Sequence, residues 1–197
     1  IAGTILVASH AAILAQDVAS MPWNAEDELW ETASDLWEHE KYSNALFGYE
    51  DWLTEQANLE DTRCAIAHYR IAFCAIQLQQ NDASRRVETF FSNYPENPLG
   101  QKIQWELANY LYRKRDWKDA INAYNGLNTL RMNSEEKLEQ KFKRGHAHFE
   151  LEAYDDARLD LFAVMEGGED SGEYQLPAKY YFSHIKQVQS GIIIGFQ

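Results

Sequence analysis

The sequence contains few of the residues that interrupt helices. Only 4 prolines and 10 glycines occur among its 197 residues, and several of them gather in residues 94–100, in residues 167–172 and at the C-terminal end. Proline and glycine are the residues that most often end a helix or form a loop. Their scarcity elsewhere leaves long stretches in which helices can form. With 45% hydrophobic residues, the chain also has enough apolar side chains for a core and is unlike a disordered tail.

Cysteine is rare as well. Cys64 and Cys74 are the two cysteines, and they lie ten residues apart on one predicted helix. A helix rises about 15 Å over ten residues, which is beyond the Cα separation that a disulfide tolerates. We therefore expect both cysteines to be small, unpaired residues of the core.

Positive charge is also in short supply. The chain carries 18 Lys and Arg residues against 31 Asp and Glu residues, which gives a formal net charge of −13 at pH 7. Nucleic acid binding depends on basic side chains that neutralise phosphates, and docking on anionic lipid has the same requirement. The charge balance therefore argues against both partners.

No apolar run is long enough to cross a bilayer, which takes about 20 residues. Residues 1–15 form the most apolar segment, with Thr4, Ser9 and His10 as its polar members. Such a segment is typical of the hydrophobic part of a secretory signal, and a short structured helix is the alternative. We expect residues 1–15 to be a partial signal peptide, residues 16–25 to be a connector, and the exported protein to have no membrane span.

A spacing of about 37 residues runs through the rest of the chain. Alanines recur at intervals of 38, 37 and 37 residues, at Ala45, Ala83, Ala120 and Ala157. A small residue precedes each of them by eleven or twelve positions, at Ala33, Ala72, Ala108 and Gly145. Small residues allow two helices to approach closely, so each unit is predicted to be a helix, a turn and a second helix.

The clearest unit spans residues 101–127. Its first helix carries one apolar stripe that includes Leu107, and a second stripe at Trp105, Asn109 and Tyr112 lies about 100° away around the helix. Two stripes indicate two packing partners. Neither helix of such a hairpin can bury its apolar surface alone, so neighbouring units must stack on it.

This series of small residue, aromatic residue and alanine resembles the tetratricopeptide repeat. Trp30 and Trp105 stand one position from the consensus tryptophan, and Pro95 stands at the closing proline. The unit is about three residues longer than the usual repeat of roughly 34 residues. In this it is similar to divergent repeats of bacterial envelope proteins, such as the lipoprotein of the β-barrel assembly machinery and the periplasmic partner of the Tol system.

The resemblance implies an all-α fold, a right-handed superhelical solenoid of about four and a half helical hairpins over residues 26–190. Residues 191–197 would start a further helix, and further repeats of the same chain would then follow. The envelope members imply an exported bacterial protein, either periplasmic or associated with the outer membrane.

The resemblance also implies a function, because proteins of this family bind a peptide or a partner protein in a concave groove lined by their first helices. The second stripe supplies the matching positions, which are Trp30, Trp37, Tyr69, Phe73, Trp105, Asn109, Tyr112, Phe142, His146 and Phe149. The alternative is that these rings pack within and between repeats. We expect most of each ring to be core, while ring edges and the polar Asn109 and His146 face the groove.

Catalytic motifs are weak in this sequence. His146 stands one helical turn before Glu150, and this pair is the best candidate for a metal site. The sequence shows no nucleophile elbow, phosphate loop or convincing triad. We therefore predict a non-catalytic protein-interaction scaffold without a cofactor. Two alternatives remain: a structural segment of a larger self-assembling repeat protein, whose stripe is sealed by its own chain or a second copy, and a metal-dependent enzyme.

Overall fold

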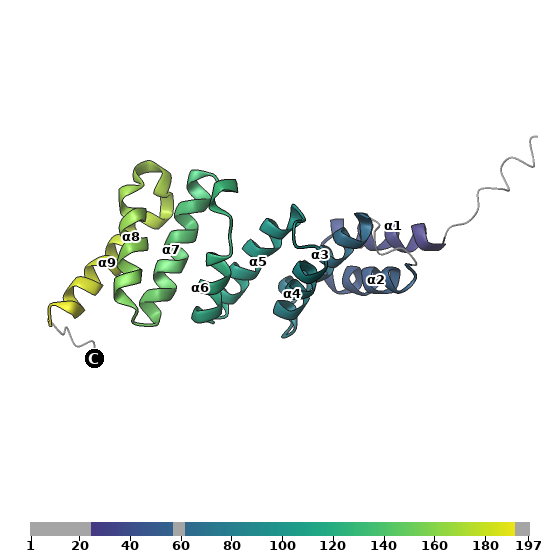
Figure 1. Cartoon of the computed structure of the whole chain (residues 1–197), viewed down its shortest axis with the longest axis horizontal. Coiled ribbons are helices and arrows are strands. Elements are labelled where there is room, and N and C mark those ends of the chain that lie inside the picture. Colours follow the sequence, from purple (N-terminus) through teal and green to yellow (C-terminus); the bar gives the residue numbers. More distant parts are fainter. Residues whose placement is uncertain (1–24, 57–61, 192–197) are drawn as a thin grey trace, which may run out of the picture.

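The computed structural model describes residues 25–56 and 62–191, and the regular elements in these two ranges are all helices (Figure 1). The predicted signal peptide, the connector up to residue 24 and the predicted helix start at residues 192–197 lie outside the described residues. The α-helices are α1 (Ala25–Glu38), α2 (Tyr42–Thr54), α3 (Thr62–Gln77), α4 (Ala83–Asn93), α5 (Leu99–Arg113), α6 (Trp117–Asn125), α7 (Ser134–Glu150), α8 (Tyr154–Glu166) and α9 (Gln175–Gln189). Two short 3₁₀ segments, η1 (Thr129–Arg131) and η2 (Gly168–Tyr174), precede α7 and α9.

Consecutive helices pair into hairpins that follow one another along the long axis of the molecule (Figure 1). The pairs are α1 with α2, α3 with α4, α5 with α6 and α7 with α8, and α9 packs on α8 as the first helix of a fifth unit. The described chain is therefore an all-α helical solenoid, as the repeat spacing predicts. None of its helices, within the two described ranges, is long and apolar enough to cross a membrane.

Each hairpin turn contains one residue with a left-handed backbone. These residues are Glu40, Gln79, Arg115 and Glu152, with φ of 56°, 54°, 60° and 59°, and each stands seven positions after the small residue of its unit. The next N–H bonds to a carbonyl five residues earlier, as in the 2.8 Å bond from Lys41 to Leu36. This pattern satisfies the last carbonyl groups of the first helix. Gly191, with φ of 72°, follows α9 in the same conformation.

Replacing Gln79 by glycine is expected to stabilise the fold by roughly 0.5–1 kcal/mol. A side chain with a Cβ is strained in the left-handed region, whereas glycine adopts it freely and loses only extra chain entropy on folding. Urea unfolding followed by circular dichroism measures the difference. Gln77→Gly, in the last turn of α3, is the control and should destabilise by about 0.5–1 kcal/mol. A loss of stability in Gln79→Gly would contradict this account of the turn.

The apolar core is divided into two clusters. The larger extends from Ala33 to Met132 and includes Trp52 and Tyr124, while the smaller joins α7, α8 and α9 around Leu161. The residues predicted to pack at the helix crossings and the two cysteines are buried without exception: Ala33, Ala45, Cys64, Ala72, Cys74, Ala83, Ala108, Ala120, Gly145 and Ala157. The spacing therefore identified the helix crossings correctly.

Polar bonds join the two clusters across the junction of the third and fourth hairpins. Gln140 Nε2 donates to the backbone oxygen of Tyr124 at 2.7 Å, and Arg144 Nη1 donates to Asn125 Oδ1 at 2.8 Å. Gln140 is 3% exposed, so its bond is shielded from water. This junction depends on hydrogen bonds as well as on apolar contact.

Candidate functional site

The predicted binding residues all lie on the first helices of the hairpins. They are Trp30 and Trp37 on α1, Tyr69 and Phe73 on α3, Trp105, Asn109 and Tyr112 on α5, and Phe142, His146 and Phe149 on α7. Asn109 is buried and the other nine are half-buried. We call the side of the array formed by α1, α3, α5, α7 and α9 the first-helix face.

The junction between α1 and α3 is closed by aromatic packing. The centroids of the Trp37 and Phe73 rings are 4.8 Å apart. The Arg70 guanidinium lies over the rings of Trp30 and Trp37, at 5.7 and 5.4 Å from their centroids. Arg70 Nη1 also donates to Ser34 Oγ at 3.0 Å. A cation of this chain therefore covers the rings at this junction.

The junctions of α7 with α5 and α9 are closed around His146. The Tyr112 hydroxyl lies 2.7 Å from His146 Nδ1, and His146 Nε2 lies 3.3 Å from Glu150 Oε1. Burial lowers the pKa of His146 and so favours the neutral ring. A neutral ring with its proton on Nε2 accepts from Tyr112 and donates to Glu150. The ring of Tyr181 on α9 lies 4.6 Å from the imidazole, centroid to centroid.

Among the described residues, His146 and Glu150 are not joined by a third side chain that could complete a metal site. Both ring nitrogens have partners in the chain, as given above. In residues 25–56 and 62–191, no group of three or more His, Cys, Asp or Glu side chains is arranged to hold a metal ion. A metal at this pair would need a ligand from elsewhere.

Helices α3 and α5 pack on each other through the larger core cluster, but their junction is not sealed by aromatic rings. Within the described part of the chain, no ring of α3 contacts a ring of α5. A cleft of about 200 Å³ lies where Tyr69 of α3 approaches α5 and the segment from η1 to the start of α7, with Tyr69 and Trp105 among its walls; we call it the α3–α5 cleft. Its other lining residues are Gln101, Lys102, Glu106, Arg131, Met132 and Glu136. Two of the predicted binding residues therefore share one accessible cleft.

Glu106 is the half-buried acid of this cleft. Burial raises its pKa, and the positive charges of Arg113 and Lys143 offset part of that effect. Lys143 already bonds to Glu139 and to Asn109 Oδ1. Among the described residues, Glu106 forms neither a hydrogen bond through its side chain nor an ion pair. Its carboxylate is therefore available to a ligand.

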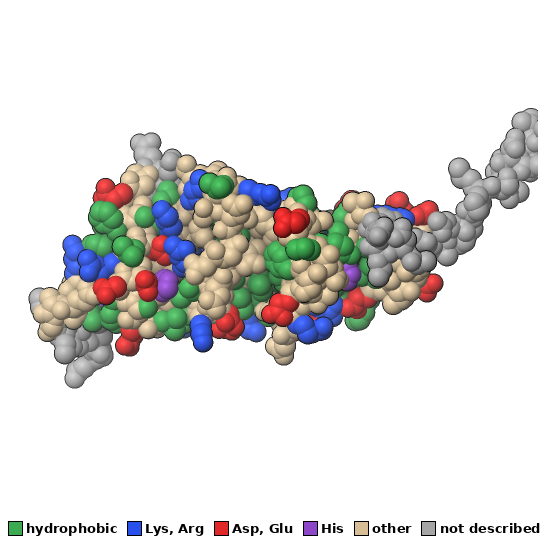
Figure 2. All heavy atoms as spheres, viewed as in Figure 1, with side chains coloured by type: hydrophobic (Ala, Val, Ile, Leu, Met, Phe, Trp, Pro, Cys, Tyr) green, Lys and Arg blue, Asp and Glu red, His purple; other side chains and the backbone are tan. Residues whose placement is uncertain are grey.

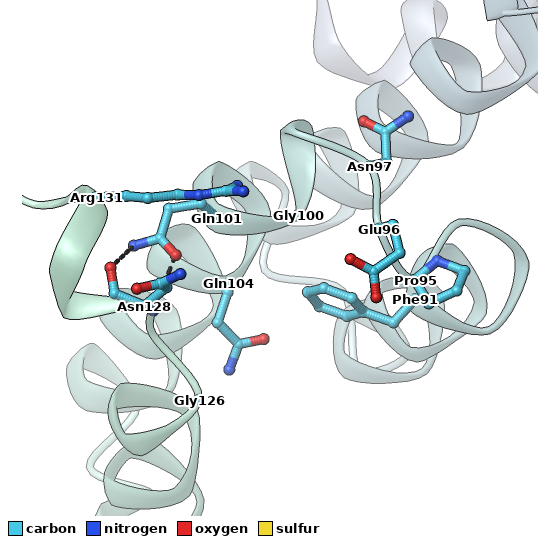
Figure 3. Close-up of a pocket in the computed structure, with 10 residues that line it drawn as sticks. All are labelled: Phe91, Pro95, Glu96, Asn97, Gly100, Gln101, Gln104, Gly126, Asn128 and Arg131. Atoms are coloured by element: carbon cyan, nitrogen blue, oxygen red, sulfur yellow. Dashed lines mark hydrogen bonds between the residues drawn. The ribbon is translucent and has the colours of Figure 1, made fainter.

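A second cleft, of about 180 Å³, lies between the α4–α5 connection and the segment that follows α6 (Figure 3). Gln101 Nε2 donates to the Asn128 carbonyl at 3.4 Å, and Gln101 Oε1 accepts from the Asn128 N–H at 3.0 Å. Gln104 Nε2 donates to the Ala123 carbonyl at 2.8 Å. These amides already form hydrogen bonds within the third unit. They are therefore less available to a ligand than the polar groups of the α3–α5 cleft. Gln101 and Arg131 border both clefts.

Charges of both signs are interspersed over the molecular face seen in Figure 2, without a continuous basic patch. Near the α3–α5 cleft, Lys102 and Arg131 are exposed. Glu136 belongs to the capping box of α7, where it accepts from the Asn133 N–H at 2.9 Å. The cleft thus combines an apolar wall, an unpaired acid and two solvated cations.

The two-stripe pattern did not identify Tyr181, Arg70 or Glu106. Tyr181 stands ten positions before the left-handed Gly191, the same distance that separates Trp30 from Glu40. Counting back from the turn would have found it. Arg70 and Glu106 each follow an aromatic residue of the stripe. From the sequence pattern alone, a charged residue at this position is predicted to lie on a solvated face of the helix.

Comparison with known proteins gives a likeness of fold. No protein-family model and no curated protein sequence matches the chain. A solved structure described as "MamA MSR-1 C2" superposes with a TM-score of 0.54 and 13% sequence identity, covering 85% of this chain and 98% of that chain. MamA contains tetratricopeptide repeats. At this identity the likeness concerns the fold alone, and the chain is a helical solenoid with a tetratricopeptide-like fold.

Proposed function

We propose that this protein is a non-catalytic interaction scaffold that binds a peptide or partner protein on its first-helix face, at the cleft between α3 and α5. The fold supports a scaffold in general, because stacked helical hairpins provide extended binding surfaces. We choose this cleft as the binding site because two aromatic rings are accessible in it. Tyr69 and Trp105 line one open space, whereas ring contacts close the neighbouring junctions.

Aromatic side chains supply much of the affinity at protein interfaces, because they bury large apolar areas with few rotatable bonds. Trp105 contacts Tyr124 of its own hairpin at 6.4 Å between ring centroids, which fixes one side of the ring. Trp105 also lines the cleft. A preorganised ring of this kind loses little entropy when a ligand binds.

Two further parts of the proposal concern setting and partners. The bacterial envelope remains our proposed location, and it depends on residues 1–15, which lie outside the described residues. The structural alternative, a segment of a larger assembly, also remains a prediction. It is supported by the apolar surface over α8 and α9, where Leu159 is 74% and Phe162 51% exposed beside a cleft of about 540 Å³.

Tyr69→Ala combined with Trp105→Ala is the test of the cleft. The sequence alone points to Trp105 with Tyr112, but Tyr112 is bonded to His146 and its loss would disturb the α5–α7 junction. Short peptides selected from a random library against the wild-type chain serve as ligands, measured by fluorescence anisotropy. We expect the double variant to bind them at least about 30-fold more weakly, the effect of losing one interface hot spot.

Tyr180→Ala is the matched control, because Tyr180 is an exposed aromatic residue on α9, away from the cleft. It should bind the same peptides as tightly as the wild type. Circular dichroism must show that the double variant keeps its helix content. Unchanged affinity in a fully helical double variant would rule out the cleft as the binding site.

A further inference from the structure

A repeated polar contact links the first helices of neighbouring units. Arg70, which follows Tyr69 in α3, donates to Ser34 of α1 at 3.0 Å. Lys143, which follows Phe142 in α7, donates to Asn109 of α5 at 2.8 Å. Both contacts use the same positions of the repeat. In both, a cation of one unit reaches a polar oxygen of the unit before it.

These two cations also lie on aromatic rings of the preceding unit. The Arg70 guanidinium is 5.4 Å from the centroid of the Trp37 ring, and Lys143 Nζ is 5.9 Å from that of Tyr112. Such placement is favourable because the face of an aromatic ring attracts a positive charge. The first-helix face therefore carries a cation on aromatic rings at the α1–α3 junction and again at the α5–α7 junction.

The α3–α5 junction has the opposite charge at this position. Glu106, which follows Trp105, is the equivalent of Arg70 and Lys143. The position in α3 that corresponds to Ser34 and Asn109 is Phe73, whose ring has no hydrogen-bonding atom and packs on Tyr42 and Trp37. This change explains why Glu106 lacks the partner that its equivalents have.

The groups around Glu106 leave it short of positive charge. The hydroxyls of Tyr42 on α2 and Tyr69 on α3 are near enough to sense its charge, and burial raises the pKa of both, so they are neutral. Arg113 on α5 and Lys143 on α7 are the cations that act on it, and neither forms an ion pair with it. A half-buried carboxylate without donors is unfavourable in the free protein.

We propose that the α3–α5 cleft binds an arginine or lysine side chain of a peptide partner, with its charged group on Glu106 and its aliphatic part between Tyr69 and Trp105. The ligand would supply at this junction the cation that Arg70 supplies at the previous one. Met132, which is 7% exposed, adds an apolar surface for the aliphatic part. This inference rests on the proposed function and specifies the chemistry of its ligand.

The exposed cations at the mouth of the cleft refine the ligand. Lys102 and Arg131 line the cleft and would repel a segment that carries only positive charge. A basic side chain next to acidic or neutral residues avoids that repulsion. We expect selected peptides to share one Arg or Lys and to lack a run of basic residues.

Glu106→Gln is the decisive variant, because it keeps the shape of the side chain and removes its charge. The peptides selected against the wild-type chain should bind the variant about tenfold more weakly. Lys102→Gln is a second test in the same cleft and should bind the same peptides more tightly than the wild type, since it removes a repulsive charge. The control is Glu88→Gln, which makes the same chemical change at an exposed glutamate of α4 outside the cleft and should bind like the wild type.

Thermal unfolding separates a ligand-binding role from a structural one. The raised pKa means that folding favours the protonated carboxyl. The protonated carboxyl contributes to folding stability below the pKa that a glutamate has in the unfolded chain, and this contribution is lost as the pH rises through the pKa in the folded protein. At neutral pH the ionised carboxylate therefore lowers the stability of the fold. Glu106→Gln should therefore have a higher Tm than the wild type. A residue that stabilises the fold would give a lower Tm.

Several outcomes would overturn the inference. The inference is wrong if the selected peptides contain no basic residue. It is also wrong if Glu106→Gln binds them within twofold of the wild-type affinity, or if this variant has a lower Tm than the wild type. If the selected peptides are acidic and bind Lys102→Gln with lower affinity than the wild type, the cleft prefers negative charge. If these peptides still depend on Tyr69 and Trp105, the cleft stands and only its ligand chemistry is wrong. If they do not, the proposed function fails too.

Discussion

Replacing Asp160 by alanine is expected to destabilise the protein by about 3–5 kcal/mol, the cost of breaking a buried ion pair from one side. Asp160 is 6% exposed, and both of its carboxylate oxygens accept from Arg144, at 2.6 Å from Nε and 2.6 Å from Nη2. These bonds raise the pKa of Arg144. Without Asp160, the half-buried guanidinium keeps its bond to Asn125 and the weaker attraction of Asp156 within the described part of the chain. Urea unfolding followed by circular dichroism measures the loss.

The control for this prediction is Asp155→Ala, because Asp155 lies on the same helix with a side chain that is 90% exposed. Its ion pair with Arg158 is long, at 3.9 Å, and an exposed pair of this kind contributes at most about 0.5 kcal/mol. The two variants remove the same chemical group from α8. If Asp160→Ala costs no more than Asp155→Ala, the paired arrangement of Asp160 with Arg144 is wrong.

Tyr124→Ala should also cost about 3–5 kcal/mol, the usual loss for a large aromatic side chain removed from a core. Tyr124 is fully buried in α6 and packs against the rings of Trp105 and Tyr112 on α5. Its hydroxyl donates to Asn109 Oδ1 at 2.9 Å. Burial raises the pKa of this hydroxyl well above its ordinary value, so it is protonated and can donate at neutral pH.

Tyr124→Phe separates packing from hydrogen bonding. It keeps the ring and removes one bond, and Asn109 Oδ1 retains the bond from Lys143 at 2.8 Å. A cost of about 1 kcal/mol is therefore expected. Equal losses in the phenylalanine and alanine variants would mean that the hydroxyl, and not the packed ring, stabilises the third hairpin. Both variants can be compared by chemical unfolding under the same conditions.

Much of the fold was predictable because its signals are local. The alanine spacing fixes where two helices cross, and the burial of Ala45, Ala83, Ala120 and Ala157 confirms it. The 3₁₀ segments η1 and η2 were not expected, since they lie in connections without a periodic pattern. The left-handed residues of the turns were also missed, because Glu40, Gln79, Arg115 and Glu152 are not the glycine that usually marks such positions.

The candidate site was predictable only in part. The second stripe correctly places Tyr69 and Trp105 on first helices, and both line the open cleft. It gives the same weight to Trp37 and Phe73, whose rings close on each other, and to His146, whose nitrogens are both occupied. Periodicity tells which side of a helix is apolar. It does not tell whether a neighbouring unit covers that side.

By itself, the sequence determined the repeating unit, the helix crossings and the positions of the stripe residues on the first helices, because each depends on spacings within one hairpin. The tertiary structure decided which junction keeps an accessible cleft and which charge there has no partner among the described residues. Those properties depend on residues more than thirty positions apart, such as Arg70 with Ser34 and Lys143 with Asn109. Phe73 stands in its unit where Ser34 and Asn109 stand in theirs, and it offers no hydrogen-bonding atom to Glu106 of the next unit. This relation appears only when the two units are stacked.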